Sequence, residues 1–369
     1  MKLSTDSSCV FYSLPGRVVF GEGCLATLAA EVEALGAQRA LVLCTPEQRD
    51  VAERVSRQLG ERSAGIFDQA VMHVPIETAR AARARAADLG ADVAVAVGGG
   101  STIGLGKAIA LDSGLPIIAI PTTYAGSEMT TIFGITEGGV KKTGRDPRVL
   151  PRTVLYDPTL TLTLPVSLST LTLTLPVSLS VTSCMNAVAH AAEGLYAPDG
   201  NPIMSLMAEA GVAAIAQALP RLCLNAQDMA ARTEALYGAW LCGKVLGHVA
   251  MSLHHKLCHT LGGSFNLPHA ETHTVVLPQA LAYNTPAAPE AMARLARAMS
   301  SATAAQGAFD LAQRHGAPVS LRELGMKAAD LDRACELALQ NQYNNPRPLE
   351  QTAIRQLLQD AFEGRRPSV

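Results

Sequence analysis

The arrangement of apolar positions divides the chain into two differently patterned parts. Within the first 150 residues, short apolar runs rich in Val, Ile, Ala and Leu occur at residues 40–44, 92–97 and 116–120. Longer stretches rich in Ala and Arg, such as residues 51–59 and 77–89, lie between these runs. Short apolar runs that alternate with helical stretches predict βαβ units and a parallel sheet.

From about Val181 onward, Ala, Leu and Met recur at spacings of three and four residues, which is typical of helices. We therefore expect an α/β domain over residues 1–158 and an all-helical domain over residues 181–369. Between them, residues 159–169 read TLTLTLPVSLS, and residues 170–180 repeat the same letters. We interpret residues 159–180 as a duplicated linker that forms an extra surface loop, because longer loops cost little additional closure entropy. The alternative is that the second copy displaces the helix that follows.

Composition limits the classes of function. Of 369 residues, 48% are hydrophobic and 17% charged, which is enough apolar surface for a sizeable core. Thirty basic and thirty-two acidic residues leave a net charge of −2, so no basic excess is present to neutralise nucleic-acid phosphates. Aromatic residues are only 4%, which argues against a base-stacking surface. We expect a small-molecule substrate and no nucleic-acid partner.

The cysteines and the apolar stretches indicate a cytoplasmic protein. The eight cysteines are scattered and form no CxxC pair, as expected for reduced thiols. The first residues, MKLSTDSSCVFYSLPG, contain no continuous apolar region, so no signal peptide is expected. The longest stretch without acidic or basic residues, 158–192, is interrupted by Pro165 and Pro176 and does not resemble a membrane span.

A glycine cluster follows the second apolar run. Gly98, Gly99, Gly100 and Ser101 stand between residues 92–97 and a helical stretch. Glycines allow close approach of an anion to the backbone, and a helix N-terminus offers free N–H groups, so a diphosphate fits here. The spacing is neither GxGxxG nor that of a Walker A loop. A tight turn that packs a helix on a sheet is the alternative interpretation.

Hydroxyl side chains follow the third apolar run. Thr122, Thr123 and Ser127 lie in the segment PTTYAGSE, at the expected carboxyl end of a strand. Ligands of open α/β sheets bind at such ends, and these hydroxyls could contact phosphate or nicotinamide amide groups. A hydroxyl-rich turn with a helix cap is the alternative.

Histidines are concentrated in one short segment. Six of the nine lie between residues 248 and 273: His248, His254, His255, His259, His269 and His273. His255 and His259 are one helical turn apart, as are Asn186 and His190 upstream. A single histidine is more often structural than functional, but this group indicates a metal or anion site.

Together, the motifs GGGST, PTTYAGSE, MNAVAHAAE and HHKLCHTLGG resemble the iron-containing alcohol dehydrogenase family, from about Arg17 to the C-terminal helices. VMHVPIETA (residues 71–79) and LHHKLCHTLGGSFNLPHAETHTVVLP (residues 253–278) resemble its maleylacetate reductase branch. The resemblance implies the architecture of dehydroquinate synthase and the iron-type alcohol dehydrogenases. That architecture has a Rossmann-like N-terminal dinucleotide-binding domain, an all-α C-terminal domain and a site in the cleft between them.

The family's metal ligands fall at Asn186, His190, His255 and His269. Asn186 departs from the pattern, because a neutral amide replaces the family's aspartate and binds a divalent ion weakly. The branch that this sequence resembles is understood to work without the metal. We therefore expect no metal requirement, although three imidazoles could still hold an ion.

The resemblance implies reduction of the carbon–carbon double bond of maleylacetate to 3-oxoadipate, in the breakdown of aromatic or chloroaromatic compounds. It also implies that His190, His255, His259 and His269 surround the substrate and nicotinamide, with His255 as the first and His259 as the second candidate proton donor. The expected cofactor-binding residues are Gly98, Gly99, Gly100, Ser101, Thr122, Thr123 and Ser127. After residues 40–44 no Asp repels a 2′-phosphate, so NADH and NADPH are both expected to serve. A homodimer is also implied.

Three alternatives stay open at this point. One is a metal-dependent dehydrogenase for a small alcohol or aldehyde, against which Asn186 counts. Another is a lyase of the dehydroquinate synthase type, for which no Lys/Arg run accompanies the histidines. The third is a folded but inactive protein, if the duplication disturbs the helix that carries Asn186 and His190.

Overall fold

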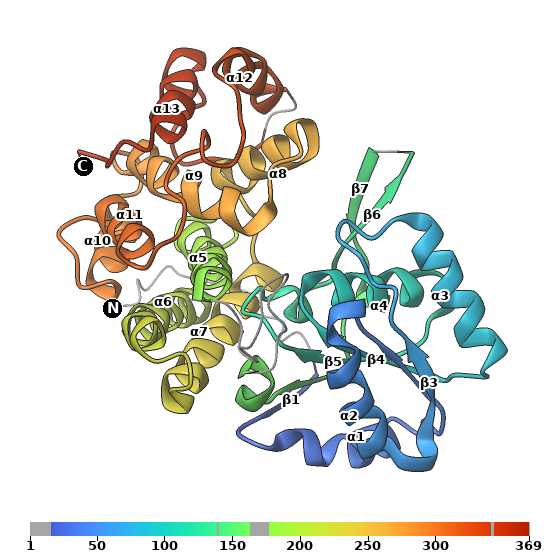
Figure 1. The fold of residues 1–369 in the computed structure, drawn as a ribbon. Helices are drawn as coiled ribbons and strands as arrows, with labels where there is room; N and C mark the ends of the chain where they lie inside the picture. Colours follow the sequence, from blue (N-terminus) through green and yellow to red (C-terminus); the bar gives the residue numbers. More distant parts are fainter. Residues whose placement is uncertain (1–15, 139, 163–176, 341–342, 369) are drawn as a thin grey trace. The chain divides into compact units, whose positions relative to one another are not determined.

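The computed structural model describes residues 16–138, 140–162, 177–340 and 343–368 (Figure 1). These form two compact units. The α/β unit contains the described residues up to 162 and also Asn225–Leu236, whereas the helical unit contains Val177–Leu224 and the chain from Tyr237 onward. The expected boundary at residues 159–180 did not include this return of the chain. Arg232 is 1% exposed and donates to the Tyr124 hydroxyl at 3.4 Å, which ties the returning segment to the α/β unit.

A six-stranded parallel sheet forms the centre of the α/β unit, in the order β1-β8-β5-β4-β2-β3. Its strands are β1 Arg17–Phe20, β2 Ala40–Leu43, β3 Ser63–Phe67, β4 Val93–Gly98, β5 Ile117–Pro121 and β8 Thr153–Tyr156. The three strands predicted from apolar runs are confirmed as β2, β4 and β5. A separate antiparallel pair consists of β6 Ile132–Glu137 and β7 Val140–Arg145.

Helices cover both faces of this sheet (Figure 1). On one face lie α1 (Leu28–Ala34) and α2 (Arg49–Leu59), and on the other lie α3 (Ile76–Asp88) and α4 (Gly100–Ser113). In β4, Val93, Val95 and Val97 pack on the α2 side, while Ala94 and Ala96 pack on the α4 side. Burial on both faces explains why the central strands are continuous apolar runs rather than alternating ones.

The glycine cluster lies where the order of the strands reverses. From β2 the chain proceeds to β3 on one side, whereas from β4 it proceeds to β5 on the other. Two neighbouring strands whose connections run in opposite directions define a topological switch point, and ligands bind outside its carboxyl ends. Because β4 ends at Gly98, the segment 98–101 lies at this point.

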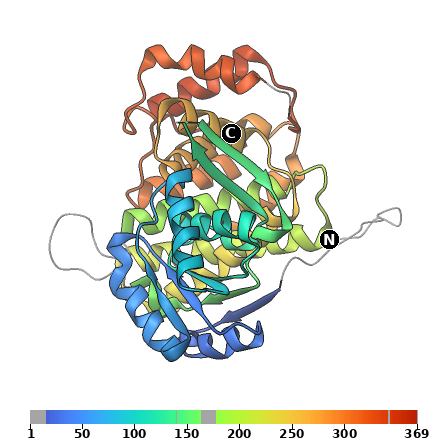
Figure 2. The ribbon, with the colours of Figure 1, turned by 90° about the vertical axis from the view of Figure 1, so that its right-hand side faces the viewer.

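The helical unit is built from nine helices of the described chain. They are α5 Val177–Gly194, α6 Pro202–Leu224, α7 Met229–His248, α8 Leu253–Phe265, α9 His269–Asn284, α10 Pro289–Ala298, α11 Ala304–Arg314, α12 Leu331–Leu339 and α13 Gln351–Glu363, with the start of α7 in the α/β unit. Figures 1 and 2 show α12 and α13 side by side, and both pack on α8 and α9 through a common apolar core. The predicted fold class is confirmed.

Within the described residues, α6 alone is long and apolar enough to cross a membrane. Its Ala208, Val212 and Ile215 are fully buried, as in a core helix. A Cβ at Gly238 of α7 would lie 2.8 Å from the Gly211 carbonyl oxygen of α6, so glycine permits this close crossing of two helices.

The described residues include only the ends of the duplicated segment. The first copy begins within the short 3₁₀ helix Pro158–Leu162, and the second ends within the first turn of α5. The predicted surface loop, residues 159–180, falls mostly on residues 163–176, which lie outside the described residues. All seven described cysteines are free thiols.

Candidate active site

Three helices bring the histidines together in the helical unit: α5 supplies His190, α8 supplies His254, His255 and His259, and α9 supplies His269 and His273. The His190 and His255 rings stack with centroids 5.1 Å apart, and the His269 and His273 centroids are 4.4 Å apart. His259 lies at the edge of the group, 6.3 Å from His255, and both His259 and His269 are exposed. All four predicted histidines therefore belong to one cluster.

His273 lies at the centre of this cluster. Its ring centroid is 4.9 Å from His254 and 4.9 Å from His255, and its Nδ1 lies 3.0 Å from Nε2 of His254. Neither His254 nor His273 was among the predicted site residues. The signal in the sequence was the spacing of His269 and His273, one helical turn apart on the helix that follows Pro268.

Glu193 is the other site residue that sequence reasoning missed. It follows His190 by three residues on α5 and is fully buried. Its Oε2 accepts from the backbone N–H of Ser252 at 2.7 Å and lies 2.8 Å from Nδ1 of His255. Its Oε1 accepts from the N–H of His254 at 2.7 Å. The carboxylate thus caps the N-terminus of α8, where a negative charge is favoured, and contacts the imidazole of His255 in the same first turn.

Burial keeps much of the cluster uncharged. It lowers the pKa of His190, His254 and His273 well below the usual value, and the neighbouring histidines lower each pKa further. These three imidazoles are therefore neutral at neutral pH. Such a group supplies hydrogen-bond donors and acceptors in a medium of low polarity, where they act strongly on a charge that develops in a substrate.

Several buried polar atoms point to ligand contacts. Asn186 Oδ1, His190 Nδ1 and His255 Nε2 have no hydrogen-bond partner among the described residues. Buried polar atoms are normally hydrogen-bonded, so these three atoms are positions at which a ligand or water would supply the partner. Together they indicate where a polar ligand would meet α5 and α8.

The four positions of the family's metal ligands do not fit a divalent ion well. Asn186 contributes a neutral amide oxygen, and no carboxylate replaces the missing charge at that position. Among the described residues, the one group of three ligand atoms that all lie within 4.8 Å of one another does not include His190, His255 or His269.

Among the described residues, only His254, Cys258 and His273 meet that distance. Metal-bound imidazoles almost always donate their second N–H to a partner. Here His254 Nδ1 and His273 Nε2 have no partner among the described residues. The group is better understood as a buried pair of hydrogen-bonded imidazoles beside a thiol than as a metal centre.

The glycine loop of the α/β unit fits a diphosphate. Gly98 has φ +153°, and a Cβ there would lie 2.5 Å from Thr102 Oγ1 and 2.6 Å from Gln48 Oε1. A Cβ at Gly100 would meet no protein atom within 4 Å, and no side chain caps α4 at Gly99. The N–H groups of the first turn of α4 are thus available to an anion, with the positive end of the helix dipole behind them.

In the second loop, the hydroxyls differ in their surroundings. Thr122 is fully buried, and its Oγ1 accepts from Gln48 Nε2 at 2.8 Å, so it ties the end of β5 to the segment after β2. Thr123 and Ser127 are half-buried, with Thr123 beside Gly99. The Ser127 carbonyl accepts from Nζ of Lys107 at 2.6 Å, and burial lowers the pKa of that lysine to about 7.

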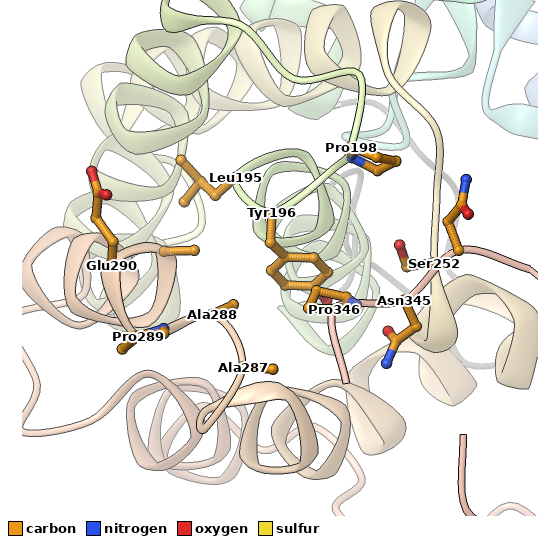
Figure 3. A pocket seen from close by; sticks show the side chains of 12 residues that line it. Leu195, Tyr196, Pro198, Ser252, Ala287, Ala288, Pro289, Glu290, Asn345 and Pro346 are labelled. Atoms are coloured by element: carbon orange, nitrogen blue, oxygen red, sulfur yellow. The ribbon is translucent and has the colours of Figure 1, made fainter. Parts of the chain in front are cut away.

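A cavity of about 550 Å³ adjoins the cluster in the helical unit (Figure 3). It lies between the turn after α5, the start of α10 and residues 344–346, and its lining includes Tyr196, Ser252 and Asn345. No histidine lines it. Its lining residue Ser252 connects it to the site, because the Ser252 N–H donates to Glu193 Oε2 at 2.7 Å.

Comparison with known proteins places this chain in a family. The sequence profile described as iron-containing alcohol dehydrogenase matches residues 15–158, and the C-terminal profile of the same family matches residues 180–362. The chain therefore belongs to the iron-containing alcohol dehydrogenase family, and it is an oxidoreductase.

Three relatives define the likeness more narrowly. A maleylacetate reductase of Burkholderia cepacia is 61% identical over 95% of this chain and 97% of its own length. A solved structure of a putative alcohol dehydrogenase from Ralstonia eutropha JMP134 has 62% identity and a TM-score of 0.94, covering 98% of this chain and 100% of the other. The maleylacetate reductase of Agrobacterium tumefaciens has 53% identity and a TM-score of 0.92, with the same coverage.

Proposed function

We propose that this enzyme reduces the carbon–carbon double bond of maleylacetate to give 3-oxoadipate, with NADH or NADPH as the reductant. The observation that carries the proposal is the near full-length identity to maleylacetate reductases. The cluster of neutral imidazoles supports it, because reduction of an activated alkene needs stabilisation of an enolate and a proton delivered to carbon.

Each unit supplies one part of this chemistry. Gly98, Gly99, Gly100 and Ser101 hold the cofactor diphosphate at the N-terminus of α4, with Thr122, Thr123 and Ser127 at the neighbouring loop. When bound, the reduced nicotinamide supplies the hydride. In the helical unit, the exposed His259 and His269 receive the substrate carboxylates when protonated, while His190 and His255 face the reacting carbons.

His255 delivers the proton in this proposal. Its Nε2 is buried and without a partner among the described residues, and its Nδ1 contacts the Glu193 carboxylate. The Nε2–H bond breaks as the new C–H bond forms, and the carboxylate compensates the positive charge of the imidazolium before transfer. Solvent then returns a proton to Nε2.

The reaction runs without a bound metal in this proposal, because Asn186 is neutral and does not provide the anionic ligand of the family's site. Chlorinated maleylacetates are expected as further substrates, a homodimer as the assembly and the cytoplasm as the compartment. Light scattering on the purified protein tests the dimer.

The test of function is NADH and NADPH oxidation with maleylacetate, before and after exhaustive chelation, on protein analysed for metal. Turnover that survives chelation in metal-free protein supports the imidazole mechanism. Activity that disappears and returns with iron or zinc would contradict the metal-free proposal while retaining the reaction. A protein that reduces small aldehydes but not maleylacetate would overturn the function itself.

A further inference from the structure

We propose that Glu193 is a positioning residue that fixes the tautomer and orientation of His255, so that Nε2 faces the substrate. This inference rests on the proposed function, because it assigns to Glu193 a role in the same proton delivery. Glu193 acts through His255 and touches neither substrate nor cofactor in this proposal.

Backbone donors surround the Glu193 carboxylate. Glu193 is fully buried, and the N–H groups of Ser252 and His254 lie 2.7 Å from its oxygens. Both groups are obligate donors, so the carboxylate acts as an acceptor toward α8. A carboxylate that accepts two backbone hydrogen bonds has no proton to donate. Nδ1 of His255, which lies 2.8 Å from Oε2, is therefore the donor of the third bond.

The contact at Nδ1 fixes the tautomer of His255. A neutral imidazole carries one proton, and a partner at one nitrogen decides which nitrogen holds it. With its proton held at Nδ1 by Glu193, neutral His255 presents a lone pair at Nε2. On protonation, the added proton is located at Nε2, on the side away from the carboxylate.

The His255 ring is held in one orientation. The two backbone donors that hold Glu193 belong to the first turn of α8, and His255 lies on the same turn. The His190 ring stacks on His255 at an interplanar angle of 29°. The His255 ring is therefore held at one edge by a carboxylate and on one face by an imidazole, so its Nε2 has a defined direction.

Glu193 does more than cap the N-terminus of α8. A cap needs only the two backbone bonds, and these are satisfied at 2.7 Å each. The bond to the imidazole is an additional contact to a residue whose second nitrogen has no partner within the described chain.

The test is the substitution Glu193→Gln. Glutamine keeps one acceptor oxygen but presents an NH₂ group, which favours an acceptor at Nδ1 and moves the imidazole proton to Nε2. We expect kcat to fall by a factor on the order of 10²–10⁴, with KM for NADH and maleylacetate changed by less than about threefold. In ¹⁵N NMR of histidine-labelled protein, His255 should change from the Nδ1–H to the Nε2–H tautomer.

Two comparisons distinguish positioning from loss of structure. Asp92→Asn alters a carboxylate that accepts the N–H groups of Gln38 and Arg39 at 2.8 Å, so it should lower stability and leave kcat unchanged. In a His255→Asn background, Glu193→Gln should have no further effect on kcat. Additive losses of kcat in the double variant would overturn the proposal.

If Glu193→Gln does not fold, Glu193→Asp retains the carboxylate and should keep the Nδ1–H tautomer with a smaller loss of kcat. An Nε2–H tautomer of His255 in the parent protein would overturn the inference whatever the activity. Failure of the parent to reduce maleylacetate, with the Nδ1–H tautomer present, would instead overturn the proposed function and leave the tautomer assignment intact.

Discussion

The glycine loop of the α/β unit and the histidine cluster of the helical unit are built in opposite ways. The loop is a continuous segment, 98–101, and its proposed anion binding depends on backbone N–H groups and on the absence of side chains at Gly98, Gly99 and Gly100. The cluster depends on side chains from α5, α8 and α9, with Glu193 and His273 eighty residues apart in sequence. The conformation of the loop follows from a few adjacent residues, whereas the histidine cluster forms only after the three helices have packed.

The largest expected effect is at the assembled site. His255→Ala removes the proposed proton donor, so kcat should fall by a factor on the order of 10²–10⁴ in the NADH oxidation assay. His315→Ala, at the C-terminal end of α11, is the matched control and should retain the parent kcat. A loss of less than tenfold in His255→Ala would contradict the assignment and favour His259.

Substitutions in the glycine loop should act on the cofactor. Gly98→Ala introduces a methyl group 2.5 Å from Thr102 Oγ1, so it should lower stability and raise KM for NADH by about 100-fold. Gly100→Ala meets no protein atom within 4 Å, so it should raise KM by about tenfold with the same melting temperature. Gly263→Ala in α8 also meets no atom within 4 Å and serves as the control. Equal KM values in all three variants would exclude the loop from cofactor binding.

Acid should destabilise the helical unit through its buried histidines. Their pKa values are lowered by burial, so the unfolded chain binds more protons than the folded chain once the pH falls below about 6.5. The free energy of unfolding should therefore fall with decreasing pH, by up to about 1.4 kcal/mol per pH unit for each of His190, His254 and His273.

Urea unfolding of His254→Gln between pH 8 and pH 5 measures this contribution. The variant should lose about 1.4 kcal/mol less per pH unit than the parent below pH 6.5, and the two profiles should be parallel above pH 7.5. Parallel profiles at every pH would show that His254 is not a buried neutral group.

The smallest effect is expected from the duplicated segment. Excision of residues 170–180 leaves one copy of the repeat before α5, and doubling a loop length costs only about 0.6 kcal/mol. The kcat/KM for maleylacetate should therefore stay within about twofold of the parent. A large gain in activity would show instead that the second copy displaces the helix carrying Asn186 and His190.

The sequence predicted the elements whose signal is local. β2, β4 and β5 are central strands with both faces buried, and each gives a continuous apolar run. β1, β3 and β8 were not singled out from the pattern. β1 and β3 are edge strands with partly exposed side chains. The buried β8 reads TVLY, and its Thr153 and Tyr156 leave only two residues of continuous aliphatic run.

Prediction of the site stopped at the residues that carry a familiar motif. His190, His255, His259 and His269 do lie together, but the burial of His254 and His273 depends on how α8 and α9 pack. Glu193 gave no separate signal, because an acidic residue near the end of a helix is usually exposed. Its partners, Ser252 and His255, are about sixty residues away in sequence, and only the fold shows that they meet.

The return of Asn225–Leu236 to the α/β unit has a consequence for how the protein forms. The α/β unit cannot be completed until a ribosome has synthesised residues far beyond its sheet, because Arg232 belongs to it. Contacts between such distant parts of a chain slow folding. A gene fragment ending before α6 would encode the whole sheet yet lack this segment. Exchange of the two units between homologous genes therefore requires three crossover points, before α5 and at the two ends of Asn225–Leu236, rather than one.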